Sequence, residues 1–528
     1  MESFLTTETL IIELLLIASL VAIAVQRLRI PYTVALVVVG LLITFQSPVK
    51  FDLTPELVLT LFVPPLVFEA AFHLNVNHLR KNFKAILVLA VPGVILSTII
   101  IGWIVSIGTT LALPVALVFG ALIAATDPVA VVALFRKLGV PKRLAILVEA
   151  ESLFNDGTAI VLFNLMLVSA LSMEFSLLNG IISFIRVSAG GIAIGLFLGW
   201  LISRLIARID DYLIETTLTT VLAFGSYLLA EQLHFSGVLA VVAAGLVNGN
   251  LGSQGMSPTT RIVLYNFWEY VAFLVNSLVF LLIGLQVNIP ALLENWQPVL
   301  VAIFAVLVAR IIVIYGFSWI INLGRETIPV RWQHVLGWGG LRGAISLALV
   351  LSLPSSMGAE RDLLLVMAFG VVLFTLLVQS TTMNKLIRRL KIVSRSPVKE
   401  EYEIRHAKLT ALRAAENHLD RRHRDGLVST HTWEKMKQEL GLQIADLSES
   451  VREVMRAEPS LESEELDTAW REVLQAQRSS FGSLRRDGVI SDDVYERLVI
   501  EVDSALQSDS LPVAEELSID EMEVDDPV

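Results

Sequence analysis

Long apolar runs separated by short polar segments fill the chain from about residue 9 to residue 384. Runs of about 17–25 mainly apolar residues are long enough to cross a bilayer as helices. We therefore predict an all-α polytopic membrane protein with thirteen transmembrane helices, of which the ninth is the shortest. Their approximate ranges are 9–26, 30–46, 54–74, 83–107, 112–135, 143–171, 178–203, 212–231, 235–249, 262–287, 297–322, 332–353 and 362–384.

The basic residues between these spans predict the orientation. Lys and Arg lie almost entirely in the odd-numbered loops, and the even-numbered loops carry only Lys50 and Arg361. An excess of Lys and Arg in short loops marks the cytoplasmic side of a membrane. We therefore expect a multi-pass protein of the cell membrane with its N-terminus outside and its C-terminal tail in the cytoplasm.

Two of the predicted spans are interrupted by residues that weaken helices. Span five contains Thr126-Asp127-Pro128, and span twelve contains the glycine-rich segment 337–343. Unwound backbone at membrane depth is tolerated only where protein buries it or where it lines a cavity. If spans 1–6 and 8–13 form two inverted repeats, the two breaks occupy corresponding places. Paired broken helices in inverted repeats are typical of the binding sites of secondary transporters.

The sixth predicted span carries ionisable residues at membrane depth. Ser152 and Asp156 are four residues apart on one helix face, and Glu151 and Asn155 are four apart on the adjacent face. Charged groups inside a membrane are energetically costly, so they indicate a functional site by default. The alternative is a purely structural aspartate that only caps a half-helix or pairs with an arginine. It is less favoured because several polar residues cluster here.

These residues offer the oxygen atoms that a hard monovalent cation requires. Asp156 and Asp127 can supply carboxylates, and Ser152 can supply a hydroxyl. Thr126 can supply a carbonyl that is free because Pro128 has no amide donor. A carboxylate between low-dielectric walls is costly to keep charged, so it can exchange a proton for a cation near neutral pH. Mutually exclusive occupancy of one movable site by the two ions is enough to produce antiport.

Two arginines in the predicted spans require partners because an unpaired charge in the membrane is costly. Arg310 is flanked by apolar residues, and Glu151 is its most plausible partner. Arg342 in the glycine-rich break and Glu69 form a second possible pair. We expect both pairs to be structural, since arginine does not release its proton.

The composition supports this class of protein and separates the tail from the membrane part. The chain is 55% hydrophobic and 17% charged, which is typical of polytopic membrane proteins. Almost all of its net charge of −11 falls after Asn384, and it contains no cysteine, which excludes disulfides and thiolate metal sites. We expect a transmembrane domain over 1–390, a soluble cytoplasmic helical domain over 396–509 and an acidic disordered tail over 510–528.

An internal repeat lies within the predicted soluble domain. The segment 424–436 resembles the segment 486–498, and each contains Arg-Asp-Gly followed by a serine. Glycine favours the end of one helix, and the serine favours the start of the next. We therefore predict two helical hairpins that form a small four-helix unit. A role in regulation or assembly and a purely solubilising role are both open.

The membrane part resembles the monovalent cation:proton antiporters of the NhaP and eukaryotic NHE type. The matching motifs are Phe-Glu-Ala at 68–70, Ala-Thr-Asp-Pro at 125–128, Glu-Ser-Leu-Phe-Asn-Asp-Gly at 151–157, Phe-Trp-Glu at 267–269 and Gly-Gly-Leu-Arg-Gly-Ala at 339–344. The resemblance covers residues 10–385 and points to the bacterial type with a cytoplasmic helical tail.

This resemblance implies a sodium/proton exchanger, usually a homodimer, in which a core domain moves against a dimerisation domain. Asp156 would carry the ion and the proton, Asn155 would organise the site, and Arg310 would pair with the glutamate of span six. The other implied members of the site are Thr126, Asp127, Ser152 and Glu151. The Asn-Asp pair resembles the electroneutral branch, which exchanges one cation for one proton.

The implied function is secondary transport by alternating access around Asp156, with a role in pH and Na⁺ homeostasis. The cation is Na⁺, with Li⁺ or K⁺ as alternatives, bound at Asp156 and Asp127. No cofactor, no enzymatic activity and no nucleic-acid partner are expected beyond the ions and the bilayer. An intramembrane aspartyl protease would show Tyr-Asp and Gly-x-Gly-Asp, a channel would show a repeated filter, and a receptor would not require midplane aspartates.

Overall fold

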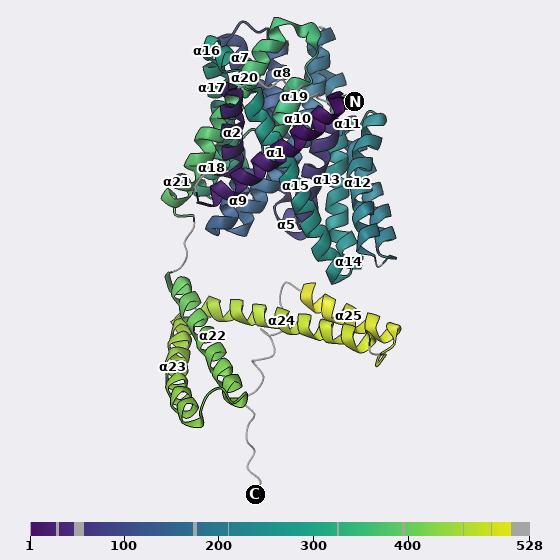
Figure 1. Cartoon of the computed structure of the whole chain (residues 1–528). Helices are drawn as coiled ribbons and strands as arrows, with labels where there is room; N and C mark the ends of the chain where they lie inside the picture. The colour runs from purple at the N-terminus through teal and green to yellow at the C-terminus, as the bar shows by residue number, and fades with distance from the viewer. Residues whose placement is uncertain are drawn as a thin grey trace. The chain divides into compact units, whose positions relative to one another are not determined.

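The computed structural model of the chain is mainly helical, and no strand occurs among the residues that it describes (Figure 1). These residues are 2–27, 31–46, 58–172, 177–209, 211–324, 327–392, 397–457, 459–486 and 488–507. They form two compact units, Met1–Val393 and Ser394–Val528. We call the first the membrane unit and the second the tail unit.

The membrane unit combines long helices with several short ones. Their bounds are α1 Glu2–Arg27, α2 Tyr32–Gln46, η1 Val58–Phe62, α4 Val63–His73, α5 Val76–Lys81, α6 Phe83–Ala90, α7 Pro92–Gly108, α8 Leu113–Ala124, α9 Val129–Leu138, α10 Lys142–Ser172, α11 Leu177–Ile206, α12 Tyr212–Gln232, α13 Gly237–Val247, η2 Asn248–Gly252, α14 Ser253–Gly255, α15 Pro258–Gln286, α16 Ile289–Glu294, α17 Trp296–Asn322, α18 Val330–Trp338, α19 Ala344–Leu351, η3 Ser355–Met357, α20 Ala359–Phe374, η4 Thr375–Ser380 and α21 Thr381–Arg389.

Each of the thirteen predicted ranges overlaps a helical segment of the membrane unit. Among the described residues, 8 helical segments are long and apolar enough to cross a membrane on their own. Four further apolar segments, Ile12–Val25, Tyr32–Thr44, Leu59–His73 and Gly237–Gly252, are shorter. The prediction of a polytopic all-α membrane protein is confirmed, while thirteen as the number of spans stays a prediction.

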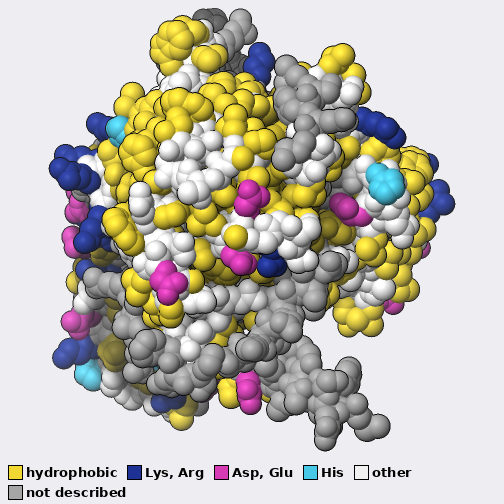
Figure 2. Space-filling view, turned by 90° about the horizontal axis from the view of Figure 1, so that it is seen from above, with side chains coloured by type: hydrophobic (Ala, Val, Ile, Leu, Met, Phe, Trp, Pro, Cys, Tyr) yellow, Lys and Arg dark blue, Asp and Glu magenta, His cyan; other side chains and the backbone are white. Residues whose placement is uncertain are grey.

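The surface of the membrane unit is suited to lipid. Large apolar side chains are exposed along its outer helices, including Ile181 and Ile185 on α11 and Trp319 on α17. Hydrophobic side chains cover much of the described surface in Figure 2. An exposed apolar surface of this extent indicates contact with a membrane or with another protein.

Both predicted helix breaks are present, and they meet. The first separates α8 from α9 at residues 125–128, and the second separates α18 from α19 at residues 339–343. The amide of Asp127 donates a hydrogen bond of 2.8 Å to the carbonyl of Leu341. This bond satisfies one backbone amide of the first break and one backbone carbonyl of the second. Irregular backbone at membrane depth requires such partners.

The tail unit contains two helical hairpins. Helix α22 (Pro397–Arg424) packs against α23 (Thr430–Ala457), and α24 (Pro459–Arg486) packs against α25 (Asp492–Gln507). The repeated glycines, Gly426 and Gly488, have φ angles of 72° and 69°. These left-handed conformations end α22 and α24, because glycine adopts them without steric cost. The acidic segment 510–528 lies outside the described residues.

Candidate cation-binding site

A pocket of ≈ 90 Å³ reaches the first helix break and the middle of α10. Its polar lining includes both predicted carboxylates, Asp127 and Asp156, together with Thr126 of the break. A cavity of this size holds several water molecules, since each needs about 10–15 Å³. The pocket can therefore admit a hydrated cation to the two aspartates.

Asp156 is the buried carboxylate in the middle of α10. It lies on α10 and is only 9% exposed. Its Oδ1 is buried and has no hydrogen-bond partner among the described residues. A buried carboxylate oxygen without a partner is energetically costly, so binding a proton or a cation there removes that cost.

Asp127 lies in the first break and contacts both the start of α9 and the second break. Its Oδ1 accepts a hydrogen bond of 2.9 Å from the amide of Val129, which is the first residue of α9. Its side chain also lies against Gly343 at the start of α19. A Cβ at Gly343 would lie 2.1 Å from Asp127 Oδ2, so the glycine is required by the close approach of the two breaks.

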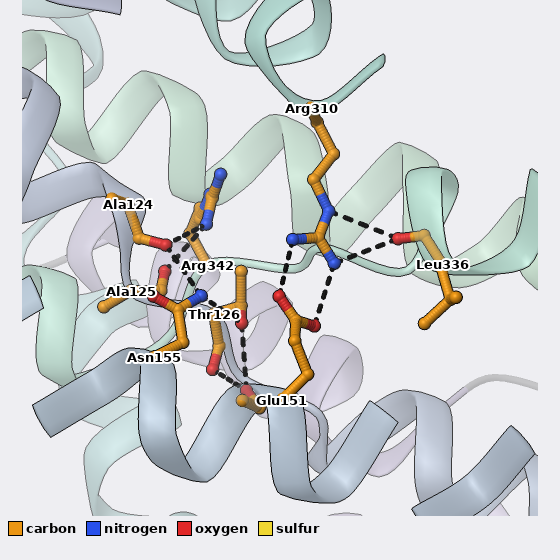
Figure 3. Close-up of polar contacts among 9 residues, drawn as sticks. Ala124, Ala125, Thr126, Glu151, Asn155, Arg310, Leu336 and Arg342 are labelled. Atoms are coloured by element: carbon orange, nitrogen blue, oxygen red, sulfur yellow. Dashed lines mark hydrogen bonds and ion pairs between the residues drawn. The ribbon is translucent and has the colours of Figure 1, made fainter. Parts of the chain in front are cut away.

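Ser152 and Asn155 hold the first break in place from the side of α10. Figure 3 shows Asn155 beside Thr126 and Ala124. The Ser152 hydroxyl donates to the carbonyl of Thr126, and the hydroxyl oxygens of the two residues are 3.0 Å apart. Asn155 Nδ2 donates to Thr126 Oγ1 at 3.0 Å and to the carbonyl of Ala124 at 3.1 Å. Of these residues only Thr126 lines the pocket. Ser152 and Asn155 therefore position the break.

Glu151 is paired with Arg310 of α17, as predicted. The guanidinium donates to both carboxylate oxygens, at 2.8 and 3.0 Å, and the two side chains are 9% and 3% exposed. Arg310 also donates to the carbonyl of Leu336 near the end of α18, at 3.0 and 3.2 Å (Figure 3). Glu151 does not line the pocket.

The predicted pair of Arg342 and Glu69 is not formed. Arg342 Nη1 donates instead to the carbonyls of Ala124 and Ala125, at 2.8 and 2.9 Å. These carbonyls lie at the C-terminal end of α8, where the helix dipole favours a positive charge. Glu69 lines the pocket, and its Oε1 lies 3.3 Å from Nδ1 of His73. Glu69 therefore belongs with the pocket and not with the buried arginines.

Three polar residues of the pocket were missed by the sequence analysis: Glu149, Asn276 and Ser346. Glu149 is two helical turns before Asp156, a spacing that places both on one side of α10. Asn276 is a polar residue within the apolar tenth span. Ser346 follows the glycine-rich break, and its hydroxyl lies 3.4 Å from the carbonyl of Ala125, to which it donates. Each signal was visible in the sequence, but none showed that the residue faces the pocket.

Sequence comparisons place this arrangement among known transporters. The family model described as "Sodium/hydrogen exchanger, transmembrane" matches residues 14–389. The Na⁺/H⁺ antiporter ApNhaP of Aphanothece halophytica is 46% identical over 396 residues, which cover 74% of this chain and 76% of that relative. The Na⁺/H⁺ antiporter NhaG of Bacillus atrophaeus is 37% identical over 496 residues, covering 91% of this chain and 93% of NhaG.

A solved structure has the same fold. The sodium proton antiporter MjNhaP1 from Methanocaldococcus jannaschii matches with a TM-score of 0.62 and 21% identity, covering 73% of this chain and 99% of that one. The family model and the antiporter relatives confirm the predicted resemblance. This chain belongs to the sodium/hydrogen exchanger family.

Proposed function

We propose that this exchanger moves Na⁺ and H⁺ in opposite directions, one for one, because the two ions occupy Asp156 in turn. The observation that carries the proposal is the buried Oδ1 of Asp156, which has no hydrogen-bond partner among the described residues and belongs to a pocket-lining side chain. A proton or a cation can each neutralise this carboxylate. Both cannot do so at once, and that exclusion couples their movements.

The ligands for Na⁺ would come from the pocket lining. Asp156 and Asp127 offer carboxylate oxygens, and Thr126 offers oxygens held in place by Ser152 and Asn155. Hard cations prefer such oxygen ligands. Li⁺ and K⁺ are the alternative transported ions. Because the three ions differ in radius, the rigidity of these oxygen ligands would determine which ion binds best.

The one-for-one ratio follows from the chemistry next to Asp156. Asn155 is an amide that neither gains nor loses a proton near neutral pH, and its Nδ2 donates the hydrogen bonds that hold the first break. Glu151 is neutralised by Arg310 in a buried bidentate pair. Asp127 accepts a hydrogen bond from the start of α9. Asp156 is therefore the group best placed to change its charge during the cycle, and an electroneutral cycle results.

Alternating access would expose Asp156 to one side at a time. The pocket runs past Glu69 and Glu149, which lie toward the cytoplasm in the predicted orientation. A second pocket is lined largely by apolar residues of α15, α19 and α20, including Val279, Leu347 and Phe369. We assign that apolar region to the closed side. Movement of the broken helices past α15 would open it.

We also propose the membrane, the orientation and the oligomeric state in which the exchanger works. The basic odd-numbered loops support a cell-membrane protein with an outer N-terminus and a cytoplasmic tail. We also propose a homodimer, as the resemblance implies, and a role in pH and Na⁺ homeostasis.

Exchange by purified full-length protein in acid-loaded proteoliposomes tests the proposal. Internal pH is followed after addition of Na⁺, Li⁺ or K⁺, first with the membrane potential clamped and then with it free. We expect Na⁺ to raise the internal pH at the same rate in both conditions. A rate that depends on the potential would contradict the one-for-one ratio, and no pH change with any cation would contradict the exchange itself.

A further inference from the structure

Helix α15 has one face fixed against α2. The rings of Phe273 and Tyr32 stack with centroids 5.4 Å apart, and the Tyr32 and Ser277 hydroxyl oxygens lie 2.8 Å apart. Further along, a Cβ at Gly284 would lie 2.3 Å from the carbonyl of Val37, so the two backbones are in contact there. Positions 273, 277 and 284 share one helix face. They attach α15 to α2 along most of its length.

Another face of α15 borders both pockets. Asn276 lines the pocket that contains Asp127 and Asp156, whereas Val279 and Ile283 line the second, apolar pocket. Residues 276, 279 and 283 follow the i, i+3, i+7 spacing of one helix face. This face therefore presents an amide at the cation pocket, followed by an apolar stretch.

Asn276 differs from the other polar residues of the pocket. The others come from α4, the first break, α10 and α19, whereas Asn276 is the lining residue that α15 contributes. Its side chain is partly buried, and no hydrogen bond or ion pair involves it among the described residues. Asn276 thus places an amide, without a partner among the described residues, in the pocket that Asp127 and Asp156 also line. A ligand in this pocket can bind that amide.

We propose that Asn276 binds the transported cation through its amide oxygen and helps to set cation selectivity, an inference that rests on the proposed exchange at Asp156. An amide oxygen replaces a water ligand without adding charge, so it leaves the one-for-one ratio intact. Because α15 is attached to α2, movement of α10 together with the broken helices, to which Ser152 and Asn155 bind it, would separate Asp156 from Asn276. The contact therefore exists only while this pocket is open.

The test uses full-length protein in proteoliposomes, with Na⁺ or Li⁺ added on either face. Asn276→Leu keeps the branched arrangement of four side-chain heavy atoms but has no oxygen, and Asn276→Asp adds a charge at the same place. Ser277→Ala is the matched control, since Ser277 belongs to the face fixed on α2. We expect Asn276→Leu to raise the KM for Na⁺ about tenfold on one face only, as loss of a polar contact to a charge predicts.

The maximal rate should stay within about twofold of wild type, because the lost contact belongs to ion binding and not to the movement. Asn276→Asp should lower the KM for Na⁺ on that same face, and both variants should change the ratio of the Na⁺ and Li⁺ KM values. If both variants keep the wild-type KM values and the wild-type ratio of Na⁺ to Li⁺ KM values, Asn276 does not bind the cation. The proposed exchange at Asp156 would be unaffected by that result. Absence of exchange by folded wild type would instead overturn the proposed function.

Discussion

At the residue scale, two buried arginines stabilise the ends of the interrupted helices. Arg342 donates to the carbonyls of Ala124 and Ala125 at the end of α8, and Arg310 donates to the carbonyl of Leu336 near the end of α18. Each broken helix thus has a guanidinium at the carbonyl end of its first half. That end of a helix carries partial negative charge and unsatisfied acceptors, which suits a cation.

Replacing Arg310 with alanine should destabilise the protein more than it changes ion affinity. The change leaves Glu151 buried and charged without its partner, which costs roughly 3–5 kcal/mol. Denaturant unfolding in detergent measures the loss, with exposed Arg186→Ala on α11 as the matched control. Because Glu151→Gln removes the stranded charge, the double variant should be more stable than Arg310→Ala alone. Equal stability of the double variant and Arg310→Ala would contradict the claim that the unpaired charge of Glu151 causes the loss.

The sequence predicted one of these two arginine contacts correctly. Arg310 and Glu151 each lie in an apolar span, and the cost of leaving either charge alone made their pairing predictable. The partner of Arg342 was not predictable in the same way. Its acceptors are backbone carbonyls of α8, and only the meeting of the two breaks brings them within reach.

At the element scale, the contact between the two breaks determines where the aspartates lie. The hydrogen bond from Asp127 to the carbonyl of Leu341 joins the two segments, and Gly343 leaves room for the Asp127 side chain. Proline and glycine in the sequence predicted where the helices stop. They could not predict that the unwound segments touch, because that contact depends on packing between elements more than 200 residues apart.

Gly343→Ala should impair exchange severely while leaving the protein folded. The added Cβ would lie 2.1 Å from Asp127 Oδ2, so the carboxylate or the start of α19 must shift. Displacements of about 1 Å in a working site can cost about a hundredfold in rate. Gly337→Ala is the matched control, because a Cβ there meets nothing within 4 Å. Near-normal exchange by Gly343→Ala would show that the close approach is dispensable.

In the first tail hairpin, Asp420 links α22 to α23. It accepts hydrogen bonds from Trp433 Nε1 at 2.7 Å and from Lys437 Nζ at 3.0 Å. These bonds, with that from Trp433 the larger cause, lower the pKa of the Asp420 carboxyl. The lowered pKa means that the contribution of Asp420 to stability is complete above the ordinary carboxyl pKa and is lost as the pH falls through the lowered value.

Asp420→Asn should therefore loosen this hairpin at neutral pH, and the difference from wild type should vanish in strong acid. Amide hydrogen exchange of peptides from α22 and α23 measures the loosening, with both proteins compared at each pH. Peptides from the second hairpin, α24 and α25, serve as the internal reference. An equal difference at all pH values would show that the Asp420 charge is not what joins the helices.

At the scale of the whole molecule, the proposed exchange requires an ion site that moves relative to the packed helix pair of α2 and α15. Asp127 lies in the first break and Asp156 on the unbroken α10, and α15, which packs on α2, contributes Asn276 to the same pocket. The length of the apolar runs predicted the helical segments well, because the bilayer imposes strong limits on length and composition. Which residues face the pocket, such as Asn276 and Glu149, depends on helix rotation and could not be predicted from one sequence.

The central claim is that Na⁺ and H⁺ exclude each other at Asp156. Proton release from detergent-solubilised protein in weak buffer, measured as Na⁺ is added, tests it most directly. We predict saturable release of one proton for each Na⁺ bound by the wild type and none by Asp156→Asn, which should remain folded. Na⁺ binding by the wild type without proton release, or equal release by Asp156→Asn, would contradict the claim.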